Sequence, residues 1–127
     1  MDMQRYFVGS GDLLLRKETG ATVLGIGSTP KLRTILLFND VLIIAKKQSR
    51  ALGSSRTLRY IFYYDFESAR VSTITVDGAE ALQLSERKTT FTFMAAAADE
   101  EHRSWLETIR HTIIKFHSSL LEQHLSQ

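Results

Sequence analysis

The most informative segment of the sequence is Lys31-Leu-Arg-Thr-Ile-Leu-Leu-Phe-Asn-Asp-Val-Leu-Ile-Ile-Ala-Lys-Lys47. Two apolar runs of about seven residues, a normal strand length, flank the pair Asn39-Asp40, which favours a tight turn. Their Ile, Leu, Val and Phe side chains pack well on a half-buried pleated surface. The stretch therefore predicts a β-hairpin. Because Lys and Arg stand at both of its outer ends, the open end of the hairpin is a candidate anion site.

The length and composition predict a single domain over residues 1–127. A chain of 127 residues can bury roughly two thirds of its unfolded surface, so its core needs no disulfide bond or structural metal to be stable. We place the core at about 7–117 and treat 118–127 as a candidate C-terminal helix extension. The sequence has no Cys, which favours a reducing, cytoplasmic setting. No apolar run approaches the ~20 residues that span a bilayer, so we expect a soluble or peripheral protein.

The charge is distributed unevenly. Residues 1–59 carry ten Lys or Arg and four Asp or Glu, a balance of +6, whereas residues 60–127 carry six and ten, a balance of −4. Such asymmetry indicates a dipole whose positive end is steered to an anionic membrane or nucleic acid. The alternative interpretation is ordinary scatter of solvated surface charge.

Alternating apolar residues and turn signals predict strands on both sides of the hairpin. A glycine-containing loop over 19–30 follows the first strand, and no Lys-Ser/Thr or helical pattern follows it, which argues against a phosphate-binding loop. A polar loop covers 48–55, and turns are expected at Asp77-Gly78 and near Arg87-Lys88. The expected strands are 7–17, the two strands of 31–47, 57–66, 70–75, 80–86 and 89–95.

From Ala98 the apolar residues recur at intervals of three and four, which predicts one amphipathic helix with an acidic first turn. Leu121 and Leu125 extend this helix, or Ser118-Ser119 ends it; the sequence leaves both open. The apolar positions are Trp105, Ile109, Ile113, Phe116 and Leu120.

The organisation is therefore mainly β with one C-terminal helix. Seven strands followed by a helix predict a strongly bent antiparallel sheet, a sandwich or an open barrel, with the helix closing one end. Trp105 is expected to plug that end, and Phe91 and Phe93 are expected in the core.

The order of these segments resembles a pleckstrin homology (PH) domain over nearly the whole chain. Within that family it is most similar to the domains that follow a Dbl homology domain in Rho guanine nucleotide exchange factors. The resemblance implies a seven-stranded barrel capped by the helix, and an accessory module whose catalytic exchange domain is separate. The motifs are Arg5-Tyr-Phe-Val8, Gly11-Asp-Leu-Leu14, Leu36-Leu-Phe-Asn-Asp-Val-Leu42, Leu82-Gln-Leu84, Thr92-Phe-Met94 and Asp99-Glu-Glu-His-Arg-Ser-Trp105-Leu106.

The resemblance also implies a phosphoinositide site. Lys31 and Arg33 match a basic pair that opens the second strand, where alternation puts both side chains on one side, and Lys17 matches a basic position of the first strand. Lys46 and Lys47 close the neighbouring strand and complete the set. Leu15 and Ile35 depart from the pattern of strong binders, so we expect weak attraction to acidic lipid at the inner plasma membrane. The alternatives are solvated strand ends and, for the Lys pair, protection of a strand edge.

A second hypothesis is a protein-interaction domain. The aromatic strand and the end of the helix would contact an adjacent Dbl homology domain, a Rho-family GTPase or a cytoskeletal partner. The candidate contact residues are Arg59, Tyr60, Tyr63, Tyr64, Leu120 and Leu121.

Other chemistry finds little support in the sequence. No two His residues stand four apart with a carboxylate ligand, no hydroxyl has a recognisable paired base, and one Arg-Tyr step is too little for nucleic-acid binding. We therefore expect no catalysis, no metal, no cofactor and no nucleic acid, and a monomer in isolation.

Overall fold

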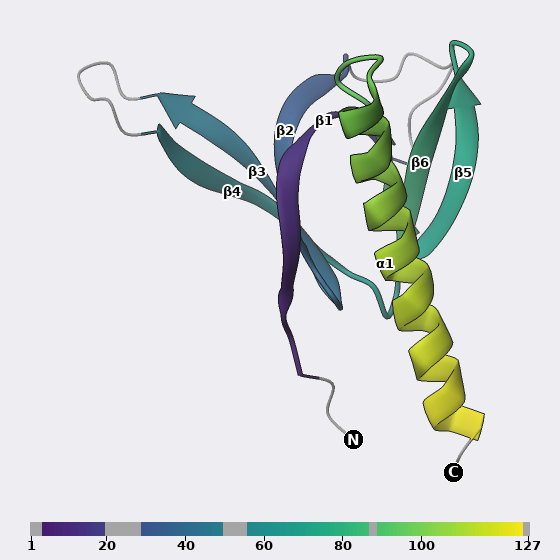
Figure 1. The fold of residues 1–127 in the computed structure, drawn as a ribbon. Helices are drawn as coiled ribbons and strands as arrows, with labels where there is room; N and C mark the ends of the chain where they lie inside the picture. The colour runs from purple at the N-terminus through teal and green to yellow at the C-terminus, as the bar shows by residue number, and fades with distance from the viewer. Residues whose placement is uncertain (1–3, 20–28, 50–55, 87–88, 126–127) are drawn as a thin grey trace.

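A computed structural model gives the structure of residues 4–19, 29–49, 56–86 and 89–125 (Figure 1). Within these ranges seven strands precede one helix, as the sequence predicts. The predicted glycines of the 19–30 loop and the predicted turn at Arg87-Lys88 lie outside them, as does most of the 48–55 loop. The elements are β1 (Phe7–Thr19), β2 (Lys31–Phe38), β3 (Val41–Ser49), β4 (Arg56–Asp65), β5 (Arg70–Val76), β6 (Ala79–Glu86), β7 (Thr89–Met94) and α1 (Glu100–Leu125).

All strands pair antiparallel in one sheet of order β4-β3-β2-β1-β7-β6-β5. β4 and β5 end this order and do not pair with each other, so the barrel stays open. Figure 1 shows α1 running along the opening between the β1–β4 half and the β5–β6 half. The predicted bent sheet with one capping helix is confirmed.

Local chemistry explains where several elements begin and end. Asp77 and Gly78 have φ angles of 51° and 81°, which a tight hairpin turn requires and Asp and Gly tolerate. The Asp99 carboxylate accepts a hydrogen bond from the His102 backbone N at 2.9 Å, and this cap and the His102 side chain lower the pKa of Asp99. The helix continues through Ser118 and Ser119 to Leu125, so of the two ends that the sequence left open, the longer helix is the one observed.

The core lies between the inner face of the sheet and one face of α1. Alternate residues of the central strands are buried there, and Phe91 and Phe93 are among them, as predicted. Burying each such side chain contributes about 1.5–3 kcal/mol. The strands contribute Leu13, Leu15, Ile35, Leu37, Leu42, Ile44, Tyr64, Leu82, Leu84, Phe91 and Phe93, and the helix contributes Leu106, Ile109, Ile113 and Phe116.

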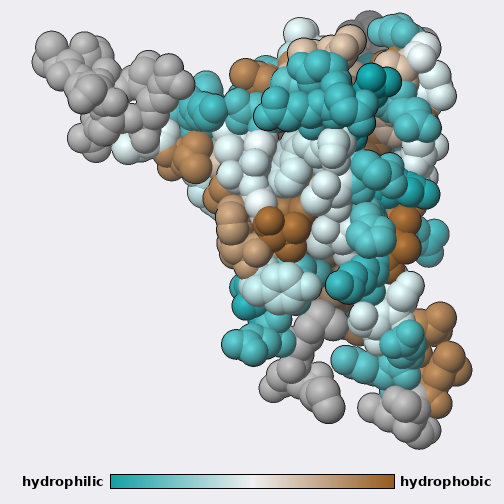
Figure 2. Space-filling model, viewed as in Figure 1, coloured by the Kyte–Doolittle hydropathy of each residue, from teal (hydrophilic) through white to brown (hydrophobic). Residues whose placement is uncertain are grey.

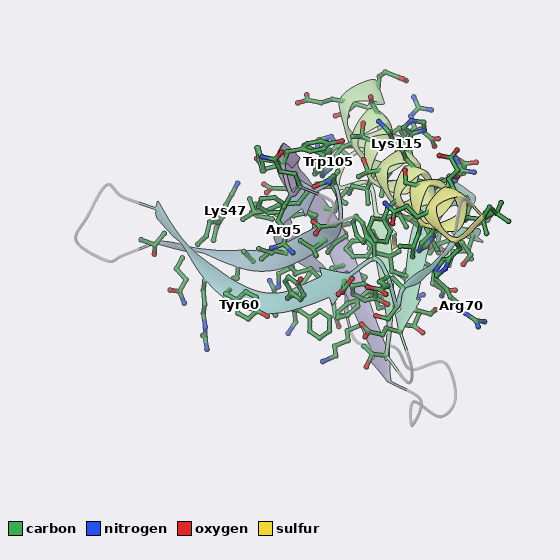
Figure 3. All side chains as sticks on the ribbon, turned by 90° about the horizontal axis from the view of Figure 1, so that it is seen from below. Arg5, Lys47, Tyr60, Arg70, Trp105 and Lys115 are labelled. Carbon is green, nitrogen blue, oxygen red and sulfur yellow. The ribbon has the colours of Figure 1, made fainter. Side chains whose placement is uncertain are left out.

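Trp105 packs on β1 where two glycines leave room for its ring (Figure 3). A Cβ atom on Gly11 would lie 2.8 Å from Trp105 Nε1, inside contact distance, whereas one on Gly9 would lie 3.4 Å from the nearest ring atom. Trp105 is partly buried against the core, in keeping with its predicted role as a plug. Gly11 is therefore required for the close approach of helix and strand.

The β2–β3 turn holds the segment that precedes β1. The Asn39 amide accepts a hydrogen bond from Tyr6 N at 2.8 Å and donates one to Gln4 O at 3.0 Å. Asn39 N donates to Tyr6 O at 3.1 Å, and Arg5 Nε contacts the Asp40 carboxylate at 2.9 Å. The two turn residues thus fix the path of residues 4–6 as well as closing the hairpin.

A polar brace crosses the outer face of the sheet. The Asp12 carboxylate accepts hydrogen bonds from Thr34 Oγ1 and Lys47 Nζ, both at 2.8 Å, and so ties β1 to β2 and β3. Partial burial alone would raise the pKa of Asp12, but these hydrogen bonds and the charge of Lys47 outweigh it and lower the pKa. The brace therefore stabilises the fold when Asp12 is ionised.

We expect Gly11→Ala to lower the free energy of unfolding by about 1–3 kcal/mol, because its Cβ would overpack against Trp105. Urea denaturation measures the change. Gly9→Ala is the matched control and should change stability little, because its Cβ meets the ring at ordinary contact distance. Equal losses in the two variants would contradict the assigned close approach.

We expect Asp12→Asn to remove part of the acid sensitivity of the protein. A lowered folded pKa stabilises above the ordinary value of 3.8, and that contribution disappears as the pH falls through the folded pKa. The variant should lose up to about 1 kcal/mol of unfolding free energy at pH 7 and progressively less below pH 3.8. Urea titrations from pH 7 to pH 2 test this, with Glu101→Gln as a charge-matched control. A deficit that stays constant across this pH range would rule out the brace.

Candidate functional site

The basic residues at the β1–β2 end of the sheet share its inner face. Directly opposed residues of an antiparallel pair point to the same face. Lys31 opposes Leu15 and Arg33 opposes Leu13, and both leucines are core residues. Lys17 opposes the core residue Phe91 in the same way. The predicted arrangement of Lys31 and Arg33 on one side of β2 is therefore what the register produces.

β3 and β4 add two more basic side chains to this face. Lys46 comes two residues after the buried Ile44, so it points to the same face. The last pair of β2 with β3 is Thr34–Ala45, and Arg33 and Lys46 are the next residues on these two strands. Lys46 opposes Arg59 of β4. We call Lys17, Lys31, Arg33, Lys46 and Arg59 the inner basic cluster.

Lys47 does not belong to the inner basic cluster. It follows Lys46 directly, so strand alternation turns it to the outer face, where it contacts Asp12. The sequence interpretation grouped Lys46 and Lys47 as one site, and the structure separates them. Arg59, which the sequence interpretation placed among the protein-contact residues, lies opposite Lys46 and belongs to the inner basic cluster.

The electrostatics of the inner basic cluster favour an anion. Among the described residues, no carboxylate forms an ion pair with Lys31, Arg33, Lys46 or Arg59, and Arg33 Nη1 donates only to the Leu32 carbonyl at 2.9 Å. Like charges opposed across two strands, as in Lys46 and Arg59, repel each other. A bound phosphate would relieve that repulsion and accept hydrogen bonds from the Arg fork and the Lys ammonium groups.

The candidate contact residues of β4 fall into two groups. Tyr60 and Tyr63 are 62% and 39% exposed, whereas Tyr64 is fully buried. The prediction of Tyr64 as a contact residue is wrong: its ring packs on Phe62 and Phe91 in the core. Burial, followed by the negative charge of Glu86, raises the pKa of Tyr64.

The two candidate contact residues near the end of α1 also differ in exposure. Leu120 is partly buried and packs against the core, whereas Leu121 is 60% exposed. Of the two candidate contact residues, Leu121 is thus the one that faces solvent.

Within the described part of the chain, α1 is the one helix, and it lacks the apolar length that a membrane span requires. The same residues contain no group of three or more His, Asp or Glu that is placed to hold a metal ion.

Comparison with known proteins identifies the family. The model of SOS1/NGEF-like PH domains matches residues 4–112. The solved PH domain of ArhGAP27 is 17% identical, with a TM-score of 0.60, and the match covers 83% of this chain and 97% of that one. The DH/PH domains of p115-RhoGEF (R399E mutant) are 16% identical, with a TM-score of 0.51, and the match covers 86% of this chain and 30% of that one. No curated protein sequence gives a significant match. The family match spans most of the chain and agrees with its fold, so the chain belongs to the PH domain family.

Proposed function

We propose that this PH domain is a non-catalytic module that binds phosphoinositide headgroups weakly through the inner basic cluster. Binding would bring the domain to the cytoplasmic face of the plasma membrane. We further propose that it serves a Rho guanine nucleotide exchange factor, where it positions or regulates a separate exchange domain.

One observation carries the lipid proposal: basic side chains from four neighbouring strands share one face at one end of the sheet. The register of the strands supports this convergence, and Lys31, Arg33, Lys46 and Arg59 lack carboxylate partners among the described residues. Lys supplies compact charges and Arg a planar fork, which together suit a ligand with adjacent phosphates.

The same site suggests modest affinity. Leu15 stands where the resemblance implies a Lys in strong binders, and here it is a core residue facing Phe93. The remaining cations contribute on the order of 1 kcal/mol each near an acidic membrane surface, and salt screens them. Headgroup preference would therefore add to a mainly electrostatic attraction.

The exchange-factor context is supported by two features of the comparisons. The matching family model is named for SOS1 and NGEF, and one structural neighbour pairs a DH with a PH domain in p115-RhoGEF. Both structural likenesses fall below 20% identity, so they support the fold, and the exchange factor remains our proposal.

A second candidate function is contact with a neighbouring domain through the end of α1. Figure 1 shows that the N-terminal segment and the end of α1 leave the body on the same side. A groove between them is lined by Tyr6, Val8 and Phe116, among others, and Leu121 and Leu125 are exposed beyond it. Exposed apolar side chains beside a groove suit a protein surface.

We expect Lys31→Ala/Arg33→Ala to abolish the preference of the 127-residue chain for phosphoinositide vesicles over phosphatidylserine vesicles of equal charge. Sedimentation at physiological salt measures binding. Arg103→Ala/Lys115→Ala on α1 removes the same charge away from the cluster and should leave the preference intact. The thermal midpoint should change little, since these side chains are not in the core. A double variant with undiminished preference would remove Lys31 and Arg33 from the site.

We expect Leu121→Ser/Leu125→Ser to leave the unfolding free energy of the isolated chain unchanged, because both side chains are exposed. In a longer protein that contains an exchange domain, the same change should lower nucleotide exchange several-fold. His124→Gln, in the same helical turns, is the control. Unchanged exchange rates in the double variant would exclude this helix surface as a domain contact.

A further inference from the structure

β5 is an edge of the sheet that lacks the features by which proteins usually protect an edge. It ends the strand order, and among the described strands it pairs with β6 alone (Figure 1). Its only charged residue is Arg70 at its start, and its register with β6 runs to Val76 without a bulge. The other edge, β4, has a bulge between Tyr60 and Phe62 and carries the exposed Arg59. Charges and bulges of this kind keep an edge from pairing with a further strand, so β5 is the edge that is open to one.

The backbone groups on the free side of β5 have no protein partner in the described part of the chain. In an antiparallel pair, alternate residues of a strand turn their N–H and C=O groups to its two sides. One set bonds to β6, and no hydrogen bond from another described element reaches the backbone of residues 70–76. Five of the seven residues of β5 are β-branched, a type that favours extended backbone. β5 is thus already in the conformation that a further strand requires.

A groove beside this edge runs between the β5–β6 hairpin and the first half of α1. Its volume is about 720 Å³. Thr73 opposes the core residue Leu82 and so points to the inner face of the sheet, yet it is exposed. The helix therefore leaves the inner side of β5 open at this point, and Figure 2 shows hydrophobic surface, in brown, on the β5 side of α1. The lining of the groove includes Thr73, Val76 and Leu82 from the hairpin and Arg103, Leu106 and Arg110 from the helix.

The groove favours apolar side chains over charged ones, because its arginines already have partners. Arg103 Nη2 lies 3.5 Å from a Glu100 carboxylate oxygen. Arg110 Nη1 lies 2.9 Å from a Glu107 carboxylate oxygen. An acidic or phosphorylated segment would compete with these ion pairs, whereas an apolar side chain would pack on Leu106 and leave them intact.

We propose that the free edge of β5 and this groove together bind an extended segment of a partner protein, which adds to the sheet as a further strand. Its backbone pairs with the free N–H and C=O groups of β5, and every second side chain points to the groove beside α1. The backbone bonds supply affinity, and the apolar residues at alternate positions supply specificity. The inner basic cluster lies on β1–β4, so this site is independent of the proposed lipid site.

A second copy of the chain suits the groove less well than a partner segment does. The residues of β5 that point inward are Val71, Thr73 and Thr75. A copy paired antiparallel about a two-fold axis would therefore present two threonines to the groove. The favoured segment differs from β5 and has larger apolar residues at alternate positions.

The test uses the 127-residue chain and three synthetic peptides in which serine alternates with valine, leucine or phenylalanine, with a lysine at each end for solubility. When a peptide binds, amide hydrogen exchange followed by NMR should slow at alternate residues of β5. Two N-methylated forms of the bound peptide are matched controls, one methylated at the serine nitrogens and the other at the apolar residues. Because only one set of nitrogens faces β5, one form should still bind and the other should not.

Thr73→Lys should weaken peptide binding about tenfold or more, because it puts a cation into the groove beside the edge. Ser72→Lys adds the same charge at the next residue, which opposes Gln83 on the outer face, and should bind the peptide as the wild type does. Both side chains are exposed, so urea denaturation should show little change in stability for either variant.

The outcomes separate the partner strand from its alternatives. Slower exchange along β5, with loss of binding in Thr73→Lys and in one N-methylated form, supports the site. Unchanged exchange with all three peptides, or equal binding to Thr73→Lys and Ser72→Lys, overturns it. Protection of β5 that grows with protein concentration in the absence of peptide, together with a sedimenting dimer, assigns the edge to a second copy and overturns the partner strand. Lys31→Ala/Arg33→Ala should bind the peptide normally, so a failure here leaves the proposed lipid site standing.

Discussion

The pairing register of β1 with β2 is the constraint on which both the core and the candidate site depend. Leu13 and Leu15 are core residues, and their direct partners across the pair are Arg33 and Lys31. A slip of one residue would turn the leucines to solvent and the basic pair to the outer face. The hydrophobic free energy that selects the register therefore also positions the charges, and the site needs no separate device to orient it.

Two contacts between segments distant in the sequence help to hold that register. The Asn39 amide ties the β2–β3 turn to the segment before β1, and Trp105 fits over Gly11 at a distance that no larger residue allows. Each contact joins elements far apart in the chain, so the start of β1 is held from both sides. The Asp12 brace acts farther along β1 and adds a polar tie on the outer face.

Sequence reasoning predicted the strands and the helix, because each depends on a local period that the residues themselves display. The β2 basic pair came from the family resemblance, and strand alternation placed its two side chains on one face. It failed on β4 for a physical reason. Strict alternation puts Tyr60, Phe62 and Tyr64 on one face. In the pairing of β4 with β3, however, Phe62 and Tyr60 oppose the consecutive residues Ile44 and Ala45, so Ile61 forms a β-bulge with no directly opposed residue. The phase changes there: Tyr64 and Phe62 pack inward, Tyr60 is exposed, and Arg59 joins Lys46.

The long-range contacts were equally invisible in the sequence. Nothing in the order of residues says that Lys47 reaches Asp12 across β2, or that Asn39 holds residues 4–6, because both depend on how strands are placed in the sheet. Gly11 was predicted to lie within the first strand, but its role in making room for Trp105 appears only when the helix lies over it. These are the features that tertiary structure supplies and local pattern cannot.

The core also sets a limit on how tightly the inner face can hold an anion. Leu15 lies between Lys31 on β2 and Phe93 on β7, so a cation at that position would leave the core short of a leucine and bury charge beside a phenylalanine. In the proposed lipid site, core stability and headgroup affinity therefore compete for position 15, and the buried leucine found there serves the core.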